Sequence, residues 1–189
     1  MTRTAWLNLC LTVIMCNSVA YAQMSAAFTA SAQKGCAPVI VQFNDASTGN
    51  PTWWRWDLGN GTISFLQHPA TTYFNPGTYT VKHVAGNDTQ KDSVTLTGYI
   101  TVDALPTVNF SSSATTGCFP LPVQLSDLTD PGSGNITNWQ WDFGDGTIST
   151  DHHPTHTYTT AGQFNISLRV KNSNGCEQTL TRTNYISLQ

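Results

Sequence analysis

Most of this chain consists of an internal repeat. The segment FTASAQKGCAPVIVQFNDAS, which begins at Phe28, matches FSSSATTGCFPLPVQLSDLT, which begins at Phe110. Further along, WRWDLGNGTIS from Trp54 matches WQWDFGDGTIS from Trp139, after a three-residue insertion in the loop DPGSGN of the second copy. An internal repeat of this length indicates two copies of one domain. With roughly 80 residues, each copy is long enough to build one hydrophobic core.

The first residues have the features of an export signal. Arg3 supplies a positive charge, an uncharged apolar run from Leu7 to Cys16 follows it, and Ala20 and Ala22 form a small-residue cleavage pattern. The apolar run is too short for a bilayer, which needs about 20 residues. We therefore predict a cleaved signal peptide at residues 1–22, a mature chain without a transmembrane segment, and a protein that is secreted or at the cell surface.

The repeat divides the mature chain into two domains. The first copy takes up residues 23–102 and the second takes up residues 108–189, with a short linker at residues 103–107. This linker is only a few residues long and contains Pro106. A short linker with proline favours a stiff joint, so we expect the two domains to stack end to end.

Composition and charge exclude one class of partner. Only 10% of the residues are charged, and the formal net charge of −3 becomes −4 when Arg3 leaves with the signal peptide. Nucleic-acid binding requires a cluster of basic residues, which this chain lacks. The abundance of Thr, Ser, Asn and Gly among short apolar runs is instead typical of an exported β-protein.

The pattern of apolar residues in the mature chain indicates strands. Short segments rich in β-branched and aromatic residues alternate apolar with polar positions, and turn residues separate them. The clearest such segments are PVIVQF from Pro38, TWWRWDL from Thr52, TYTVKHV from Thr78, SVTLTGYITV from Ser93 and QFNISLRV from Gln163. Several short strands in a domain of about 80 residues predict an all-β fold, with each copy an antiparallel β-sandwich.

The segment around each Trp-x-Trp-Asp sequence is rich in chemical groups, but the repeat favours a structural role for them. Alternation places the two tryptophans on the inward face of a strand. The glycines of GNG and GDG supply the positive φ of a tight turn, and the preceding aspartate can accept hydrogen bonds from it. Because Asn60 stands where Asp145 does, the acid at that position is not shared by the copies, which favours a structural role over catalysis. This hairpin motif consists of Trp54, Trp56, Asp57, Gly59 and Gly61 in the first copy, and of Trp139, Trp141, Asp142, Gly144, Asp145 and Gly146 in the second.

The second copy resembles the PKD domain, the polycystic-kidney-disease-type repeat. WDFGDG, PTHTY, GQFNI and NSNGC provide the hairpin, the P-x-H-T-Y segment, the following strand and the N-x-x-G-C turn of that family. In the first copy, Asn60 and Thr71 replace the hairpin aspartate and the histidine, and the NGC turn is missing. The resemblance covers nearly all of the mature chain. It implies a seven-stranded immunoglobulin-like sandwich that serves exported or cell-surface proteins as a spacer, adhesion module or accessory domain and is not itself an enzyme.

The mature chain has an odd number of cysteines, because Cys10 and Cys16 leave with the signal peptide and three remain. Cys118 opens the second copy and Cys176 lies in its last turn. A disulfide between them would stabilise so small a domain, typically by about 2 to 4 kcal/mol. We therefore predict a Cys118–Cys176 disulfide. Cys36 lacks a partner position in its own copy and is expected to be unpaired, unless a neighbouring molecule or further sequence supplies the second sulfur.

A histidine cluster is one candidate for a metal site. His152 and His156 share a face of an extended segment while His153 points away, and no further Cys or His nearby completes a tetrahedral set. The first copy keeps only His68, at the place of His153. We therefore expect no zinc site, and these histidines are expected to be exposed or to stabilise a turn.

Calcium is the better metal candidate. Some PKD-like domains hold calcium with Asn, Asp and backbone oxygens near strand ends, and this resemblance points to Asn44, Asp45 and Asp127. No glutamate and no twelve-residue loop accompanies them, so the sequence does not specify a calcium site. No other cofactor is expected.

Trp53 breaks the match between the copies. It has the opposite parity to Trp54 and Trp56 and shares a face with Arg55, and Asn138 replaces it in the second copy. If that face is exposed, Trp53 can stack on a sugar ring. The alternative is that Trp53 packs against the other domain or a facing loop.

Three hypotheses about function follow. The first is a non-enzymatic extracellular or cell-surface spacer or adhesion module that contacts a protein or polysaccharide, because the residues shared by the copies belong to core and turns. The second is a carbohydrate-binding accessory module, centred on Trp53 and Arg55, of a longer exported polysaccharide- or protein-degrading enzyme. The third is an enzyme, for which Asp142 and Asp145 are the best acids, but no nucleophile motif such as G-x-S-x-G supports it.

Overall fold

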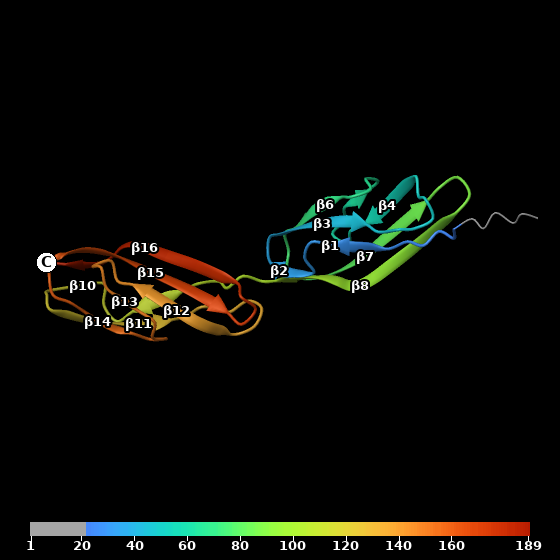
Figure 1. The fold of residues 1–189 in the computed structure, drawn as a ribbon. Helices are drawn as coiled ribbons and strands as arrows, with labels where there is room; N and C mark the ends of the chain where they lie inside the picture. The colour runs from blue at the N-terminus through green and yellow to red at the C-terminus, as the bar shows by residue number, and fades with distance from the viewer. Residues whose placement is uncertain (1–21) are drawn as a thin grey trace, which may run out of the picture.

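The computed structural model describes residues 22–189, so residues 1–21 of the predicted signal peptide lie outside the described part of the chain. The described residues form two β-sandwiches that follow one another end to end (Figure 1). Within residues 22–189, no helix is long and apolar enough to cross a membrane.

The first sandwich packs a three-stranded sheet against a five-stranded sheet. The smaller sheet has the order β1 (Phe28–Ala30), β3 (Val39–Asp45), β6 (Ala70–Tyr73). The larger sheet has the order β2 (Lys34–Cys36), β8 (Lys91–Asp103), β7 (Gly77–Gly86), β4 (Trp53–Asp57), β5 (Ile63–Ser64). All pairs are antiparallel except β2 with β8, which run parallel at the edge nearest the second domain.

The second sandwich repeats this arrangement strand for strand. Its smaller sheet has the order β14 (Thr155–Tyr158), β11 (Leu121–Asp127), β9 (Phe110–Ser112). Its larger sheet has the order β10 (Thr116–Gly117), β16 (Glu177–Leu188), β15 (Gly162–Asn172), β12 (Ile136–Asp142), β13 (Ile148–Ser149). The short strand β10 pairs in parallel with β16, as β2 does with β8.

The predicted fold class is confirmed, since each copy is an antiparallel β-sandwich with one core. Alternation along β4 and β12 turns every second residue inward, which leaves Trp56 and Trp141 fully buried. Leu58 and Phe143 continue these inward faces and are also buried. Each tryptophan meets a phenylalanine of the opposite sheet edge to face, at 5.3 Å between ring centroids.

Candidate functional site

The hairpin that follows each buried tryptophan is held by its own aspartate. Asp142 Oδ1 accepts a hydrogen bond from the backbone N–H of Gly144 at 2.9 Å, and Asp57 Oδ1 accepts one from Gly59 at 3.1 Å. Gly144 has a φ of +79°, and a Cβ there would lie 2.4 Å from the carbonyl oxygen of Asn165. Only glycine fits this position, because the neighbouring strand passes directly over the turn.

Asp145 and His156 form a pair that the first domain replaces as a unit. His156 Nε2 lies 2.6 Å from Asp145 Oδ2, and the imidazole stacks on the ring of Phe143 at 4.3 Å. In the first domain, Asn60 Nδ2 donates to Thr71 Oγ1 at 3.0 Å. The two differences between the copies are therefore one coupled exchange, in which an amide and a hydroxyl replace a carboxylate and an imidazole.

Neighbouring groups hydrogen-bond to both oxygens of the Asp145 carboxylate. Burial raises the pKa of this carboxyl, but hydrogen bonds from Thr147 and His156 outweigh burial, so the pKa lies below its usual range. Asn60 Oδ1 accepts from the Thr62 backbone at 3.1 Å, as Asp145 Oδ1 does from Thr147 at 3.0 Å. Both side chains thus close the same turn, which an amide does as well as an acid.

The two aspartates proposed as calcium ligands each bind an indole. Asp45 Oδ2 accepts a hydrogen bond from Trp54 Nε1 at 2.7 Å, and Asp127 Oδ2 accepts one from Trp139 Nε1 at 2.7 Å. Asn44 is exposed on β3. Burial raises the pKa of Asp45, but hydrogen bonds from neighbouring side chains and backbone outweigh burial and lower it. These aspartates tie the half-buried first tryptophan of each motif to the smaller sheet, a contact that no local sequence pattern indicates.

The histidines of the second domain lie beside this aspartate. The backbone N–H of Asp127 donates to His153 Nδ1 at 3.1 Å, and the His152 ring contacts the Trp139 ring at 4.4 Å between centroids, tilted by 38°. His68 repeats the first of these contacts, since it accepts from the Asp45 backbone at 3.2 Å. Among the described residues, no three His, Cys, Asp or Glu side chains are grouped closely enough to hold a metal ion.

His83 is the one histidine that enters a core in the described part of the chain. It is fully buried on β7, and its ring stacks on Trp56 at 3.8 Å between centroids. Neither ring nitrogen has a hydrogen-bond partner among residues 22–189, and the nearest carboxylate oxygen, Asp45 Oδ1, is 3.7 Å away. Burial lowers the pKa of His83 and outweighs the attraction of Asp45. Leu168 takes this position opposite Trp141 in the second domain.

Replacing His83 with leucine should stabilise the first domain most strongly at mildly acidic pH. An unfolded histidine takes up a proton near pH 6.5, whereas the buried one does so only at lower pH, so stability is complete above about 6.5 and falls as the pH drops below it. The slope for one proton is at most about 1.4 kcal/mol per pH unit. Urea unfolding between pH 7.5 and 5 measures this: the free energy of unfolding of the variant, relative to that of the parent, should increase as the pH falls. Parallel curves would show that His83 is equally easy to protonate in both states.

The predicted Cys118–Cys176 disulfide is wrong, and so is the prediction that Cys36 is unpaired. Cys36 at the end of β2 is bonded to Cys176, with 5.6 Å between their Cα atoms, and Cys118 is exposed and free. Cys118 lies with β10 at the end of the second sandwich remote from the first, whereas the turn carrying Cys176 faces the first domain (Figure 1). Cys118 and Cys176 therefore lie too far apart to bond within the second domain. Cys176 bonds instead to Cys36, so the disulfide joins the two domains.

Polar contacts surround this bond at the joint. Asp103 ends β8 and accepts hydrogen bonds from Asn174 Nδ2 at 3.0 Å, while Lys34 Nζ lies 3.3 Å from its other oxygen. Beside them, the backbone N–H of Ala104 donates to Ser133 Oγ at 2.8 Å, and the Ser133 N–H donates back to the Ala104 carbonyl at 3.3 Å. The two domains are thus tied together by one covalent bond and a group of side chains from both.

Trp53 and Arg55 lie on the outward face of β4. Trp53 is 39% exposed, and its ring rests on Gly86 of β7, where a Cβ would come within 2.2 Å of the indole. Lys82 and Lys91 are exposed on the neighbouring strands of the same sheet. Among the described residues, neither lysine nor Arg55 lies within salt-bridge distance of a carboxylate. This face, which we call the Trp53 face, therefore combines one aromatic ring with unpaired cations.

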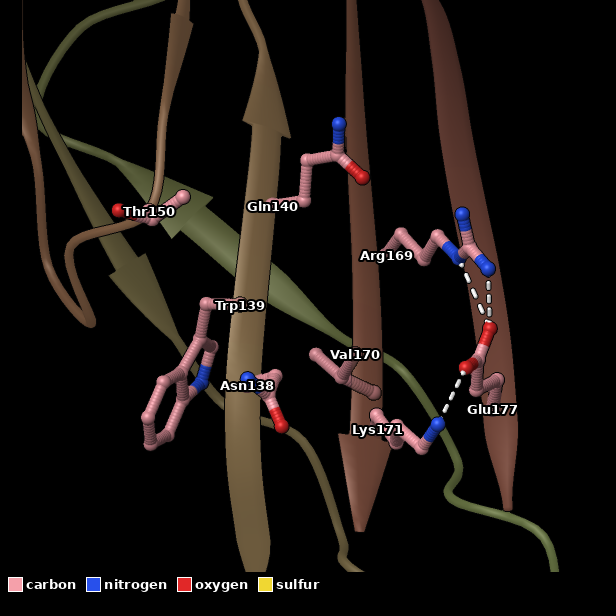
Figure 2. A pocket seen from close by; sticks show the side chains of 8 residues that line it. All are labelled: Asn138, Trp139, Gln140, Thr150, Arg169, Val170, Lys171 and Glu177. Atoms are coloured by element: carbon pink, nitrogen blue, oxygen red, sulfur yellow. Dashed lines mark hydrogen bonds and ion pairs between the residues drawn. The ribbon is translucent and has the colours of Figure 1, made fainter. Parts of the chain in front are cut away.

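The corresponding face of the second domain is a hollow of about 220 Å³ with a different character (Figure 2). Its cations are paired, because Arg169 and Lys171 on β15 both contact Glu177 on β16. Hydrogen bonds from these two side chains lower the pKa of Glu177. The lining residues are Asn138, Trp139, Gln140, Thr150, Arg169, Val170, Lys171 and Glu177. Trp139 points away from Arg169, Lys171 and Glu177 (Figure 2), so among the residues that line this hollow no ring offers a stacking platform beside the paired charges.

Known proteins share this domain. The family model of the PKD domain matches residues 21–102 and 104–188. A microbial collagenase of Vibrio alginolyticus is 48% identical over 59 residues, which are 31% of this chain and 7% of the collagenase. The pre-pro-metalloprotease PrtV of Vibrio cholerae serotype O1 is 36% identical over 63 residues, which are 33% of this chain and 7% of that protein. The aligned segments are thus less than a tenth of each relative's length.

A solved structure of the same kind of domain is also similar. The PKD1 domain of Vibrio anguillarum Epp is 30% identical, with a TM-score of 0.41, and the match covers 46% of this chain and 99% of that domain. Each family match spans one of the two sandwiches, from its first strand to its last. The chain belongs to the PKD domain family, of which it contains two copies in tandem.

Proposed function

We propose that this chain is a non-enzymatic exported spacer that holds neighbouring parts at a fixed separation and presents its loops to a protein or polysaccharide. The observation that carries the proposal is the Cys36–Cys176 bond between the domains. Two domains that share only a small polar interface ordinarily move relative to each other. A covalent bond between them restricts this motion and therefore favours a fixed separation. Asp142 and Asp145 accept hydrogen bonds from backbone N–H groups within the hairpin turn, which favours a scaffold over a catalytic centre.

Small-angle X-ray scattering of the oxidised mature chain tests the spacer. One extended two-domain shape should account for the data, and the shape should not change with salt, since a covalent bond is not screened. A profile that requires a broad ensemble of interdomain angles would refute a fixed separation. Turnover of a generic protein or polysaccharide substrate, lost on replacing Asp142 and Asp145, would refute the non-enzymatic part.

The second candidate is a carbohydrate-binding accessory module, and the Trp53 face favours it. An exposed indole stacks on a sugar ring, and cations without carboxylate partners attract acidic groups. A shallow hollow of about 300 Å³ on this sheet is lined by Lys82, Val84, Lys91, Asp92 and Ser93, so two lysines and one aspartate border it. Because the second domain pairs its cations with Glu177, we place the contact on the first domain and expect an acidic polysaccharide to bind better than a neutral one.

Replacing Trp53 with alanine should weaken polysaccharide binding by about 5- to 30-fold, since one stacking contact between an aromatic ring and a sugar ring is worth on the order of 1 to 2 kcal/mol. Pull-down with an insoluble acidic polysaccharide, against an uncharged one, measures this. Phe65 is 70% exposed in the same domain, just beyond β5. Its replacement by alanine is the matched control and should change nothing. Equal binding by the parent and the Trp53 variant would remove this candidate.

A further inference from the structure

Cys118 has the same place in the second domain that Cys36 has in the first. Cys36 ends β2, which pairs in parallel with β8 so that Gly35 lies opposite Val102. Cys118 follows β10, which pairs in parallel with β16 so that Gly117 lies opposite Leu188. The two sulfurs are therefore carried by the same backbone position at the same end of each sandwich. Cys36 is bonded to the next domain, and Cys118 is exposed.

The partner of Cys36 is a preformed turn. Asn172 is almost fully buried, and its Oδ1 accepts hydrogen bonds from the N–H groups of Asn174 at 3.1 Å and Cys176 at 3.0 Å. Gly175 has a φ of +85°, which the turn requires. The side chain of Asn172 thus sets the turn that presents Asn174 and Cys176 together to the preceding domain.

The surface around Cys118 offers the matching groups. A hollow of about 310 Å³ is lined by Thr116, Gly117, Cys118, Ser187 and Gln189. Gln189 follows Leu188 as Asp103 follows Val102, so it occupies the position whose oxygen accepts from Asn174 at the existing joint. A glutamine side-chain oxygen accepts a hydrogen bond from an amide as a carboxylate does.

We propose that Cys118 forms an interdomain disulfide with a further PKD-type domain that carries an N-x-x-G-C turn between its last two strands. A second copy of this chain does not supply that turn. Its own Cys176 is already bonded, and the corresponding turn of its first domain has Asn87 and Gln90 but no cysteine. The partner is thus a third sandwich, joined to the second as the second is joined to the first.

The bond forms by oxidation of two thiols. The Sγ atoms of Cys118 and of the partner's turn cysteine lose one proton each and together two electrons, and one S–S bond forms. A disulfide oxidant takes up the electrons and protons; oxidised glutathione becomes two molecules of reduced glutathione. The inference extends the proposed spacer by naming its neighbour, and it does not depend on whether the chain binds a polysaccharide.

A three-domain chain tests this. Residues 104–189 are appended after Gln189, which repeats the spacing of the Asp103–Ala104 joint, and the chain is oxidised with glutathione. Peptide mapping without reduction should find Cys118 bonded to the appended turn cysteine and a free thiol only in the appended copy of Cys118. In the same molecule, the Cys36–Cys176 bond reports that the domains have folded. Serine in place of the appended turn cysteine is the matched control, which should leave Cys118 open to alkylation.

Two results would overturn the proposal. One is a three-domain chain in which Cys36–Cys176 has formed while Cys118 still reacts with an alkylating reagent. The other is a chain of residues 23–189 that, under the same oxidant, forms a Cys118–Cys118 dimer as readily as the three-domain chain forms its bond, since any thiol would then serve. In the first case the proposed spacer is unaffected, because it rests on the existing Cys36–Cys176 bond. The scattering experiment tests the spacer separately.

Discussion

Replacing Trp141 with alanine should remove a large part of the stability of the second domain. The side chain is fully buried, and its Nε1–H donates to the Asp151 carbonyl at 2.9 Å. Losing a buried tryptophan costs about 3 to 5 kcal/mol, and a domain of roughly 80 residues has only about 4 to 12 kcal/mol in total. Guanidinium unfolding should therefore show the transition of the second domain at a much lower midpoint, while the transition of the first domain remains.

Two further variants make this result specific. Trp141→Phe keeps a ring but loses the hydrogen bond, so it should cost less than the alanine variant. Ile148→Ala removes a side chain that is 64% exposed in the same hairpin and should leave the midpoint within about 0.5 kcal/mol. If Ile148→Ala were as damaging as Trp141→Ala, the hairpin rather than the core tryptophan would determine stability.

Removing the interdomain disulfide, through Cys36→Ser with Cys176→Ser, should uncouple the two domains. The bond closes a loop with a sequence separation of 140, for which the chain-entropy model gives a contribution of roughly 5 kcal/mol. Unfolding by denaturant should then begin at a lower concentration, and each domain should unfold without affecting the stability of the other. Hydrogen exchange at the Ala104 N–H, which Ser133 Oγ accepts, should become faster because the joint opens more often.

Cys118→Ser is the control for the double variant, because Cys118 is exposed and free. It should leave both the unfolding curve and the Ala104 exchange rate unchanged. If the double variant behaved like this control, Asp103, Asn174 and Ser133 would be sufficient to hold the joint without the covalent bond. A count of free thiols cannot replace this experiment, since the mature chain has one free thiol whether Cys176 pairs with Cys36 or with Cys118.

Local sequence patterns predicted the strands and hairpins well. Trp56 and Trp141 alternate with polar residues over short segments. In a half-buried strand successive side chains point to opposite faces, so burying the tryptophan decides which face every other residue of the segment takes. The glycines of the hairpins follow from a positive φ, which is a property of the local chain. Comparison of the two copies then separated shared core positions from variable polar ones without any tertiary information.

Pairs of residues that meet across sheets were harder to predict. Asp45 and Trp54 are adjacent in space because β3 and β4 belong to different sheets of one sandwich, and no local pattern encodes that contact. A signal was nevertheless present, since Asp127 and Trp139 repeat the pair in the second copy. The joint exchange of Asn60 and Thr71 for Asp145 and His156 was a second such signal, because two changes together suggest two residues in contact.

The sequence by itself determined that the chain holds two β-sandwich domains, because alternation and turn chemistry are local properties and the repeat shows them twice; the resemblance of its motifs indicated the PKD family. Only the tertiary structure decided which cysteines pair. Cys118 and Cys176 belong to one copy, but β10 and the turn after β15 lie at opposite ends of that sandwich, whereas end-to-end stacking brings Cys36 against Cys176. A disulfide requires Cα atoms within about 7 Å, and the arrangement of the two domains, not the position of a cysteine within its copy, sets that distance.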